Sequence, residues 1–226
     1  MEALAHIRSP YGEKFGVPRQ SGLAPLSVSR IVFEPKYRDP EALRGLEGFD
    51  FIWLLWAFSN SATGGGDAHS SWSPTVRPPR LGGNRRMGVF ATRSTFRPNP
   101  IGLSSVRLLR ILPDTPEGPV IEVSGADLMD GTAIFDIKPY LSYCDSHPDT
   151  ACGWVDGVKE RRLDVKWACD APRELREEIA QFLALDPRPS YIDDESRSYG
   201  FLYRGMNVRF QVVGGSLTVL SVETKD

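Results

Sequence analysis

The sequence predicts a mainly β fold, in which a β-rich N-terminal domain with long loops precedes a small α+β domain. From residue 1 to about residue 155, short apolar runs are broken by Gly and Pro, as in strands joined by turns. From about residue 165 onward, a helical repeat of apolar residues is followed by two alternating runs around a Gly-Gly pair. We therefore expect one domain at residues 1–160 and a second at residues 165–226.

Seven apolar runs in the first domain are its candidate strands. The most apolar is 51–58 (FIWLLWAF), which is far shorter than the roughly 20 residues of a membrane-spanning helix. We therefore expect it to be a buried strand and expect no membrane span. The seven runs are residues 3–9, 28–33, 51–58, 88–92, 101–112, 120–124 and 133–137.

Two helices and one hairpin complete the prediction. Asp39 can cap a short helix that has Pro40 at its first position and ends near Gly45. Asp170 opens a longer helix, which the Asp-Pro-Arg-Pro sequence at 186–189 ends, since proline does not continue a helix. The apolar residues of this helix recur at i, i+4, i+7 and i+8 and are Leu175, Ile179, Phe182 and Leu183. The hairpin comprises residues 206–213 and 216–222 around Gly214-Gly215.

Positive charge is concentrated in one stretch of a chain whose net charge is only −2. Residues 68–113 contain eight arginines and no Asp, Glu or Lys, whereas the remainder carries 19 basic and 29 acidic residues. The rigid donor fork of arginine suits phosphates, carboxylates and stacked bases, so the stretch predicts a recognition surface. Pairing of these arginines with acids elsewhere in the fold is the alternative. The eight are Arg77, Arg80, Arg85, Arg86, Arg93, Arg97, Arg107 and Arg110.

The cysteines and the first residues bear on the cellular compartment. Three cysteines are an odd and small number for 226 residues, which favours reduced thiols. Residues 1–10 lack the apolar core of a secretory signal. We expect a cytoplasmic protein.

Three common kinds of catalytic site are not indicated. The glycines at 82, 83 and 88 lead into an apparent strand rather than a helix, unlike a dinucleotide-binding loop. Cys144, His147 and Cys152 have a spacing that matches no common zinc site, and no fourth ligand is evident, so we expect no metal. None of the three histidines lies in a nucleophile-elbow context, which argues against hydrolase chemistry.

The segment 75–103 (TVRPPRLGGNRRMGVFATRSTFRPNPIGL) combines prolines, glycines and arginines. Prolines preset the backbone, glycines permit close approach, and arginines with Asn99 supply fixed hydrogen-bond donors. Such a surface suits an anionic or polar ligand.

Seven runs carry a resemblance that extends nearly end to end. They are residues 11–20 (YGEKFGVPRQ), 77–84, 88–102, 127–132 (DLMDGT), 136–140 (DIKPY), 186–191 (DPRPSY) and 199–210. In these runs the chain resembles the TrmO family of tRNA methyltransferases, also called TsaA-like proteins. The resemblance implies a single-sheet β-barrel domain with a small C-terminal domain, usually as a homodimer. It also implies an S-adenosyl-L-methionine-dependent enzyme that methylates N6 of threonylcarbamoyladenosine, at A37 beside the anticodon of tRNA-Thr.

The same resemblance implies the residues that bind the cofactor. They are Pro18, Arg19, Gln20, Ser59, Asn60, Arg93, Leu103, Asp127, Leu128, Met129 and Asp130. This chain has Ser59-Asn60 where other members carry His-Gln. Arg93 would hold the cofactor carboxylate and Asp127 or Asp130 its ribose or ammonium, with an ion pair and a turn residue as the structural alternatives for Arg93 and Asp130.

Transfer of a methyl group to N6 requires a base, because the lone pair of this urea-type nitrogen is delocalised and its proton must leave. The sequence does not identify this base; Asp127 is one candidate catalytic residue, and its expected role in cofactor binding competes with that one. For tRNA phosphates we expect Arg77, Arg80, Arg85, Arg86, Arg97 and Arg188, and for stacking on an anticodon-loop base Tyr191 or Trp72. Two readings from other classes stay open: a non-catalytic RNA-binding module, and an interaction domain whose arginines dock an acidic protein.

Overall fold

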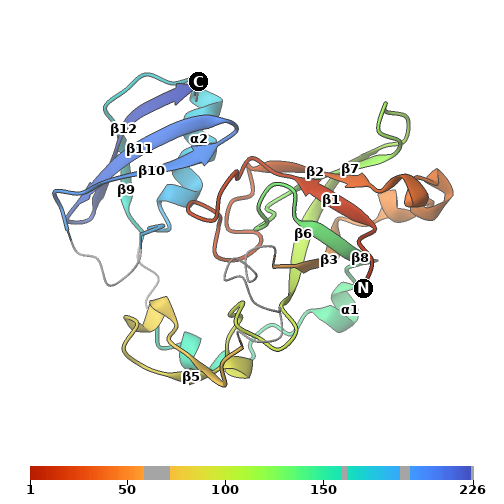
Figure 1. Cartoon of the computed structure of the whole chain (residues 1–226), viewed down its shortest axis with the longest axis horizontal. Coiled ribbons are helices and arrows are strands. Elements are labelled where there is room, and N and C mark those ends of the chain that lie inside the picture. The colour runs from red at the N-terminus through yellow and green to blue at the C-terminus, as the bar shows by residue number, and fades with distance from the viewer. Residues whose placement is uncertain (59–71, 159–161, 189–193, 225–226) are drawn as a thin grey trace.

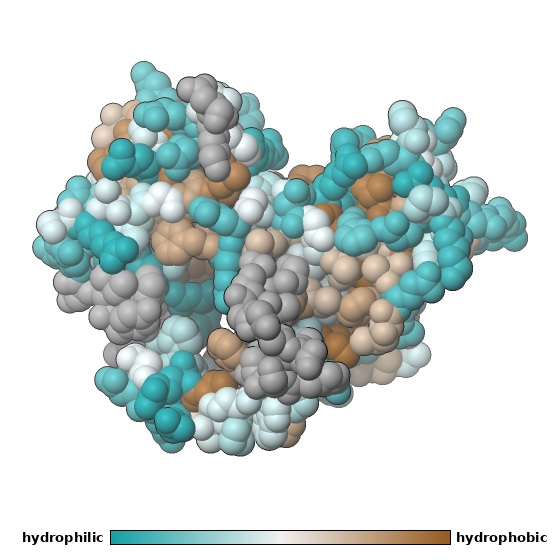
Figure 2. All heavy atoms as spheres, viewed as in Figure 1, coloured by the Kyte–Doolittle hydropathy of each residue, from teal (hydrophilic) through white to brown (hydrophobic). Residues whose placement is uncertain are grey.

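The computed structural model describes residues 1–58, 72–158, 162–188 and 194–224, which form two bodies lying side by side (Figure 1). One body is a closed barrel, and the other is a four-stranded sheet with one helix. On the face shown in Figure 2, polar side chains are abundant on both bodies, and smaller apolar patches lie among them. The expected mainly β fold, with a β-barrel and a small α+β part, is confirmed.

The barrel consists of six antiparallel strands in the order β1-β2-β7-β6-β3-β8, and it closes where β8 pairs with β1. Side chains of successive residues alternate between its interior and its surface, so that Ile52, Leu54 and Trp56 of β3 lie in the core. The strands are β1 (Ala5–Arg8), β2 (Val28–Phe33), β3 (Phe51–Ala57), β6 (Ile101–Leu112), β7 (Val120–Ser124) and β8 (Ala133–Pro139). Six of the seven expected strands are therefore present.

The expected strand at 88–92 is wrong. Only a two-residue pairing forms there, between β4 (Thr75–Val76) and β5 (Met87–Gly88), and the chain then curls into the 3-10 helix η5 (Val89–Ala91). Arg97 explains the difference, because one of its Nη atoms donates to the carbonyls of Val89, Thr92 and Ser94 at 2.8–3.4 Å. These carbonyls face one guanidinium instead of a neighbouring strand.

Short helices fill the connections around the barrel. The helix expected after Asp39 is the 3-10 helix η2 (Pro40–Leu43), and the Asp39 carboxylate accepts from the backbone N–H of Glu41, which confirms the cap. The other short helices are η1 (Pro35–Tyr37), η3 (Leu46–Gly48), η4 (Pro79–Leu81), α1 (Ser142–Asp145) and η6 (Gly153–Val155).

The second body is a sheet in the order β10-β11-β12-β9 with helix α2 (Arg173–Leu183). The expected hairpin is present as β11 (Met206–Val213) and β12 (Ser216–Thr224). Helix α2 begins three residues later than expected, because Asp170 pairs with Arg176 instead of capping the helix and Pro172 precedes the first turn. Strands β9 (Asp164–Trp167) and β10 (Ser198–Tyr203) were not expected.

The two bodies share the segment 9–27, which joins β1 to β2. Tyr11 and Ala24 from this segment belong to the core of the second body, in contact with α2 and the strands β10 to β12. Backbone hydrogen bonds reinforce the contact, since the N–H of Arg204 donates to the Pro10 carbonyl at 2.8 Å. The segment that carries Pro18, Arg19 and Gln20 is therefore held by both bodies.

None of the helices in the described ranges is both long enough and apolar enough to cross a lipid bilayer.

Candidate cofactor and RNA site

Four segments that are distant in the sequence meet at Asp127. The guanidinium of Arg93 donates to the side-chain oxygen of Gln20, and its charge lowers the pKa of Asp127. The hydroxyl of Ser104 lies 2.5 Å from Oδ1 of Asp127, and the backbone N–H of Ser21 lowers the pKa of this carboxyl. The structure thus brings together three predicted cofactor residues, namely Gln20, Arg93 and Asp127.

A tight turn after β7 places Asp127. Gly125 adopts a positive φ of 74°, and its backbone is paired with the segment 9–27 through Gly22 and Ser27. Added atoms at Gly125 would approach the backbone of Gly22 to 3.2 Å, so the small residue permits the two segments to touch. This packing carries the chain directly from the barrel to the loop beside Gln20.

The environment of Asp127 contains opposing influences on its ionisation. Burial raises the pKa of the carboxyl and is the largest influence, while the hydrogen bond from Ser104, the backbone N–H groups and the charge of Arg93 lower it. The net direction is upward. A partly buried carboxyl with a raised pKa beside a cation is suited both to holding a polar ligand and to accepting a proton.

The neighbours of Asp127 in the sequence are placed differently. Leu128 is fully buried in the barrel core, so only its backbone can meet a ligand. Asp130 accepts a hydrogen bond from the backbone N–H of Ser9 at 2.9 Å and precedes Gly131, whose φ is 74°, as in a turn. Met129 accepts at its carbonyl from the side chain of Thr132 in the same turn. These contacts support the interpretation of Asp130 as a turn residue better than they support a role in cofactor binding.

Leu103 is exposed to solvent, whereas Pro18 is buried. Leu103 on β6 is 57% exposed, which fits a side chain that covers a ligand rather than one that fills the core. Pro18 is buried within the segment 9–27. The resemblance implied that Leu103 packs against the adenine of the cofactor, whereas its place on a strand favoured the core as the alternative.

Arg19 points toward the second body. Its guanidinium donates to the carbonyls of Asp186 at 2.9 Å and Arg188 at 3.2 Å. Partial burial lowers the pKa of Arg19, and the nearby charge of Arg80 lowers it further. The side chain of Arg19 therefore joins the segment 9–27 to the loop after α2. Because the charge of Arg80 acts on Arg19, Arg80 of the arginine stretch lies on the same side of the molecule.

The arginines expected to meet tRNA fall into two groups. Arg77, Arg80, Arg85 and Arg86 are exposed, and Trp72 beside them is 46% exposed. Arg97 is instead occupied by the three carbonyls around η5, and Arg188 is buried in a two-point ion pair with Asp186 at 2.8 and 2.9 Å.

The alternative hypothesis for the arginine stretch was that its arginines pair with acidic residues elsewhere in the fold. Within the part of the chain that is described, Arg110 pairs with the buried carboxylate of Glu122 at 2.5 Å, and the other seven arginines form no ion pair with a described acidic residue. The segment that includes β5 lies at the bottom of the view in Figure 1, apart from the barrel strands. The described acidic residues therefore neutralise one of these eight arginines by an ion pair.

Three predicted residues lie outside the described residues, namely Ser59, Asn60 and Tyr191. Sequence reasoning in turn missed Ser104 and Ser21. The sequence could have pointed to Ser104. In the alternating run 101–108 the inward-facing residues are glycine or aliphatic except for Ser104, which has the one hydroxyl among them.

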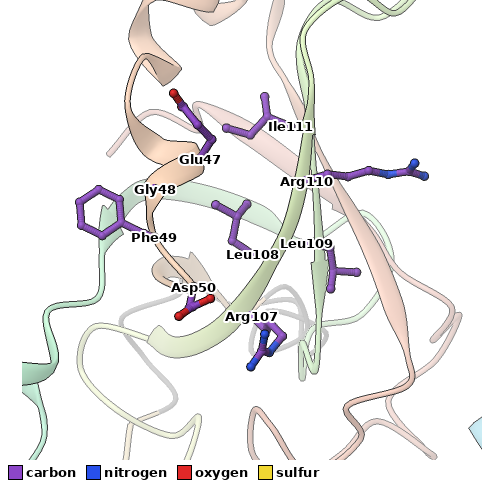
Figure 3. A pocket seen from close by; sticks show the side chains of 9 residues that line it. All are labelled: Glu47, Gly48, Phe49, Asp50, Arg107, Leu108, Leu109, Arg110 and Ile111. Atoms are coloured by element: carbon purple, nitrogen blue, oxygen red, sulfur yellow. The ribbon is translucent and has the colours of Figure 1, made fainter.

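Among the described residues, no three His, Cys, Asp or Glu side chains come together as metal ligands would. A pocket of about 560 Å³ lies beside η3 along the other half of β6, lined by residues 47–50 and 107–111 (Figure 3). It contains none of the predicted site residues.

Comparisons with known proteins extend over most of the chain. The crystal structure of TrmO from Pseudomonas aeruginosa superimposes with a TM-score of 0.74 at 33% identity, covering 97% of this chain and 96% of that one. The tRNA (adenine(37)-N6)-methyltransferase of Escherichia coli K12 is 39% identical over 99% of this chain and 97% of its own length. The enzyme of the same name from Eikenella corrodens is 44% identical over 77% of this chain and 97% of its own length.

Two family models match consecutive parts of the chain. The tRNA-methyltransferase O N-terminal domain matches residues 6–146, and the TrmO C-terminal domain matches residues 159–225. These matches span the barrel, the segment 9–27 and the second body. The chain belongs to the TrmO family of tRNA methyltransferases.

Proposed function

We propose that this protein is an S-adenosyl-L-methionine-dependent tRNA methyltransferase that modifies N6 of adenine 37. The observation that carries the proposal is the meeting of Gln20, Arg93 and Asp127 in one site, in a chain that matches both parts of the family. Relatives named tRNA (adenine(37)-N6)-methyltransferase support the reaction.

The residues present fit the cofactor chemically. Arg93 supplies a cationic donor fork for a carboxylate, and Asp127 supplies an anionic acceptor for an ammonium or a ribose hydroxyl. The exposed Leu103 on the neighbouring strand adds apolar surface for a base. When bound, S-adenosyl-L-methionine supplies a methyl group on a sulfonium sulfur.

The expected substrate is threonylcarbamoyladenosine in the anticodon loop of tRNA-Thr. The exposed residues Arg77, Arg80, Arg85 and Arg86 are suited to its phosphates, because arginine pairs with phosphate through two donors. Arg19 and Arg80 lie close enough for their charges to interact, which extends the positive surface from the arginine stretch to the segment 9–27.

N6 must lose its proton as the methyl group arrives. Asp127 is the best-placed acceptor among the described residues of the site, because its carboxyl is held beside Arg93 and has a raised pKa. The proton would reside on a carboxylate oxygen of Asp127 until it passes to water.

The proposal extends to the roles of the two domains and to the assembly of the protein. We assign residues 1–160 to cofactor binding and methyl transfer, and residues 165–226 to a TrmO-type domain that assists tRNA binding. A homodimer in the cytoplasm, where tRNA is modified, completes the proposal.

The decisive experiment uses S-adenosyl-L-methionine with a labelled methyl group, the full chain, and tRNA-Thr with or without the threonylcarbamoyl group. We expect label in N6 of the modified nucleoside only. Arg93→Ala should weaken cofactor binding by at least about tenfold in calorimetry, the effect of one hydrogen bond to a charged group. Arg107→Ala, in the same stretch but stacked on Phe51, is the matched control.

The two alternative hypotheses predict different results in these experiments. A non-catalytic RNA-binding module would bind tRNA in a salt-dependent manner and show no affinity for the cofactor. A domain that docks an acidic protein would bind neither, and label would not appear in the tRNA.

A further inference from the structure

Three polar side chains form a directed chain inside the barrel that ends at Asp127. The indole Nε1 of Trp56 on β3 donates to the hydroxyl of Ser104 on β6 at 3.0 Å, and this hydroxyl in turn lies 2.5 Å from Oδ1 of Asp127. Both Trp56 and Ser104 are buried, with 7% and 1% of their surfaces exposed. Water therefore does not compete for these groups.

The chemistry of the donors fixes the direction of the chain. An indole N–H can only donate, so the Ser104 oxygen must accept from Trp56. The single hydroxyl proton of Ser104 is then left for Asp127. Oδ1 of Asp127 is consequently an acceptor, which favours the ionised carboxylate at this oxygen.

The barrel holds Trp56 in place. Trp56 faces Gly102 across the β3–β6 pair, and a Cβ atom at position 102 would lie 2.2 Å from Cε2 of the indole. The glycine thus makes the space that the ring occupies. The ring also meets Phe58 edge to face, with 4.4 Å between the ring centroids.

Other groups act on the same carboxylate from different elements. The backbone N–H of Ser21 approaches it from the segment 9–27, Arg93 places its positive charge nearby, and the phenol of Tyr11 interacts with its charge. Burial raises the pKa of Asp127 and the hydrogen bond from Ser104 lowers it. Ser104 is the largest of the lowering influences.

We propose that Ser104 and Trp56 are positioning residues that hold the carboxylate of Asp127 as the acceptor of the N6 proton. The proposal rests on the proposed function, because it concerns the base for that same methyl transfer. Ser104 occupies Oδ1 and fixes the plane of the carboxylate, so that the second oxygen keeps one direction. Trp56 acts one step further away, since it stops the Ser104 hydroxyl from rotating to another acceptor.

The proposal predicts a change in pH dependence that a merely structural role would not produce. Without the hydrogen bond from Ser104, protonation of Asp127 becomes easier and its pKa rises further. The acid limb of the methyl-transfer rate must then move to higher pH. Trp56→Phe keeps an aromatic ring but removes the N–H, so it should shift the limb in the same direction by a smaller amount.

The test measures the single-turnover rate of methyl transfer as a function of pH, with full-length protein and tRNA-Thr carrying the threonylcarbamoyl group. For Ser104→Ala we expect the acid limb to move up by roughly one pH unit and the rate near neutral pH to fall about tenfold. Ser104→Thr, which keeps the hydroxyl, should restore the wild-type profile. Ser105→Ala, one residue further along β6 and on the opposite face of the strand, is the matched control and should change neither.

The outcomes separate this proposal from the proposed function. If the wild-type protein transfers no methyl group, the proposed function fails. If the wild type is active but Ser104→Ala keeps the wild-type acid limb at saturating cofactor, the positioning role is overturned. Should Ser104→Ala melt below the assay temperature, Trp56→Phe provides the same readout, and an unshifted limb there also overturns the proposal.

Discussion

The phenol of Tyr11 donates a hydrogen bond of 2.9 Å to the hydroxyl of Ser27, and both residues are buried where the barrel meets the second body. Ser27 also lies 3.2 Å from the phenol of Tyr203, which donates to Glu178 at 2.9 Å. The Tyr11 ring packs edge to face on Phe182 of α2. One polar network and one aromatic cluster thus join the two bodies.

We expect Tyr11→Phe to lower the free energy of unfolding by about 1 kcal/mol. The change removes one buried hydrogen bond and keeps the ring, and such a bond contributes about 0.5–1.5 kcal/mol net. Urea unfolding measures the effect. Tyr143→Phe, at a residue that is 85% exposed, should leave the free energy unchanged, and equal effects of the two substitutions would contradict the role of the network.

Stability should decline at alkaline pH because of the same network. Burial raises the pKa of both Tyr11 and Tyr203 above the ordinary tyrosine value near 10, so the unfolded chain loses these protons before the folded one does. The stability that the neutral phenols contribute is complete below pH 10 and is lost as the pH rises further. Urea unfolding at pH 8, 10 and 11 should show this decline, and Tyr11→Phe should show a smaller one.

Replacement of Gly102 by alanine should disturb the barrel at Trp56. Its Cβ would overlap the indole, and overpacking of this kind costs about 1–3 kcal/mol. The expected result is a lower urea midpoint and an altered tryptophan emission. Gly48→Ala is the control, because nothing lies within 4 Å of a Cβ there and its backbone is not left-handed. A Gly102→Ala protein as stable as the wild type would contradict this packing.

Loss of the Arg19 side chain should weaken cofactor binding from a distance. Arg19→Ala removes both hydrogen bonds to the loop after α2, which frees Gln20 to move, and we expect a roughly tenfold loss of affinity in calorimetry. Arg19→Lys should not restore it, because an ammonium lacks the planar fork that spans two carbonyls. Arg38→Ala removes a similar bond to the Phe33 carbonyl elsewhere on the barrel and should leave the affinity intact.

The salt dependence of tRNA binding should report the exposed arginines. Each phosphate contact contributes close to one unit to the slope of log affinity against log salt. Arg85→Ala combined with Arg86→Ala should therefore reduce the slope by about two. Lys36→Ala, which removes an exposed charge paired with Glu2, should not alter it, and an unchanged slope in the double variant would place the tRNA elsewhere.

The strands were the most predictable part of the fold. Residues 28–33, 101–112 and 120–124 are strands with the expected bounds, because alternation and flanking turn residues act locally. Residues 88–92 were predicted wrongly, since a guanidinium several residues away takes up their carbonyls. Strand β9 is short, and it pairs in parallel with β12, more than 50 residues later, a relationship that no local pattern contains.

The site was predictable only in outline. The resemblance named Gln20, Arg93 and Asp127, and the fold brings them together. The contacts of the site that the sequence did not predict depend on strand register. The bond from Trp56 to Ser104 exists because β3 and β6 align Leu54 with Ser104 and Trp56 with Gly102, and neither sequence run determines that alignment by itself.

The segment 9–27 is in effect a long hairpin loop of the barrel whose apolar side chains complete another hydrophobic core. Surface loops ordinarily tolerate insertions and deletions at little thermodynamic cost. Here a change in length would pull Tyr11 out of the second body or shift Gln20 away from Arg93. Two partners constrain the loop at once, so its spacing can drift only when both adjust together.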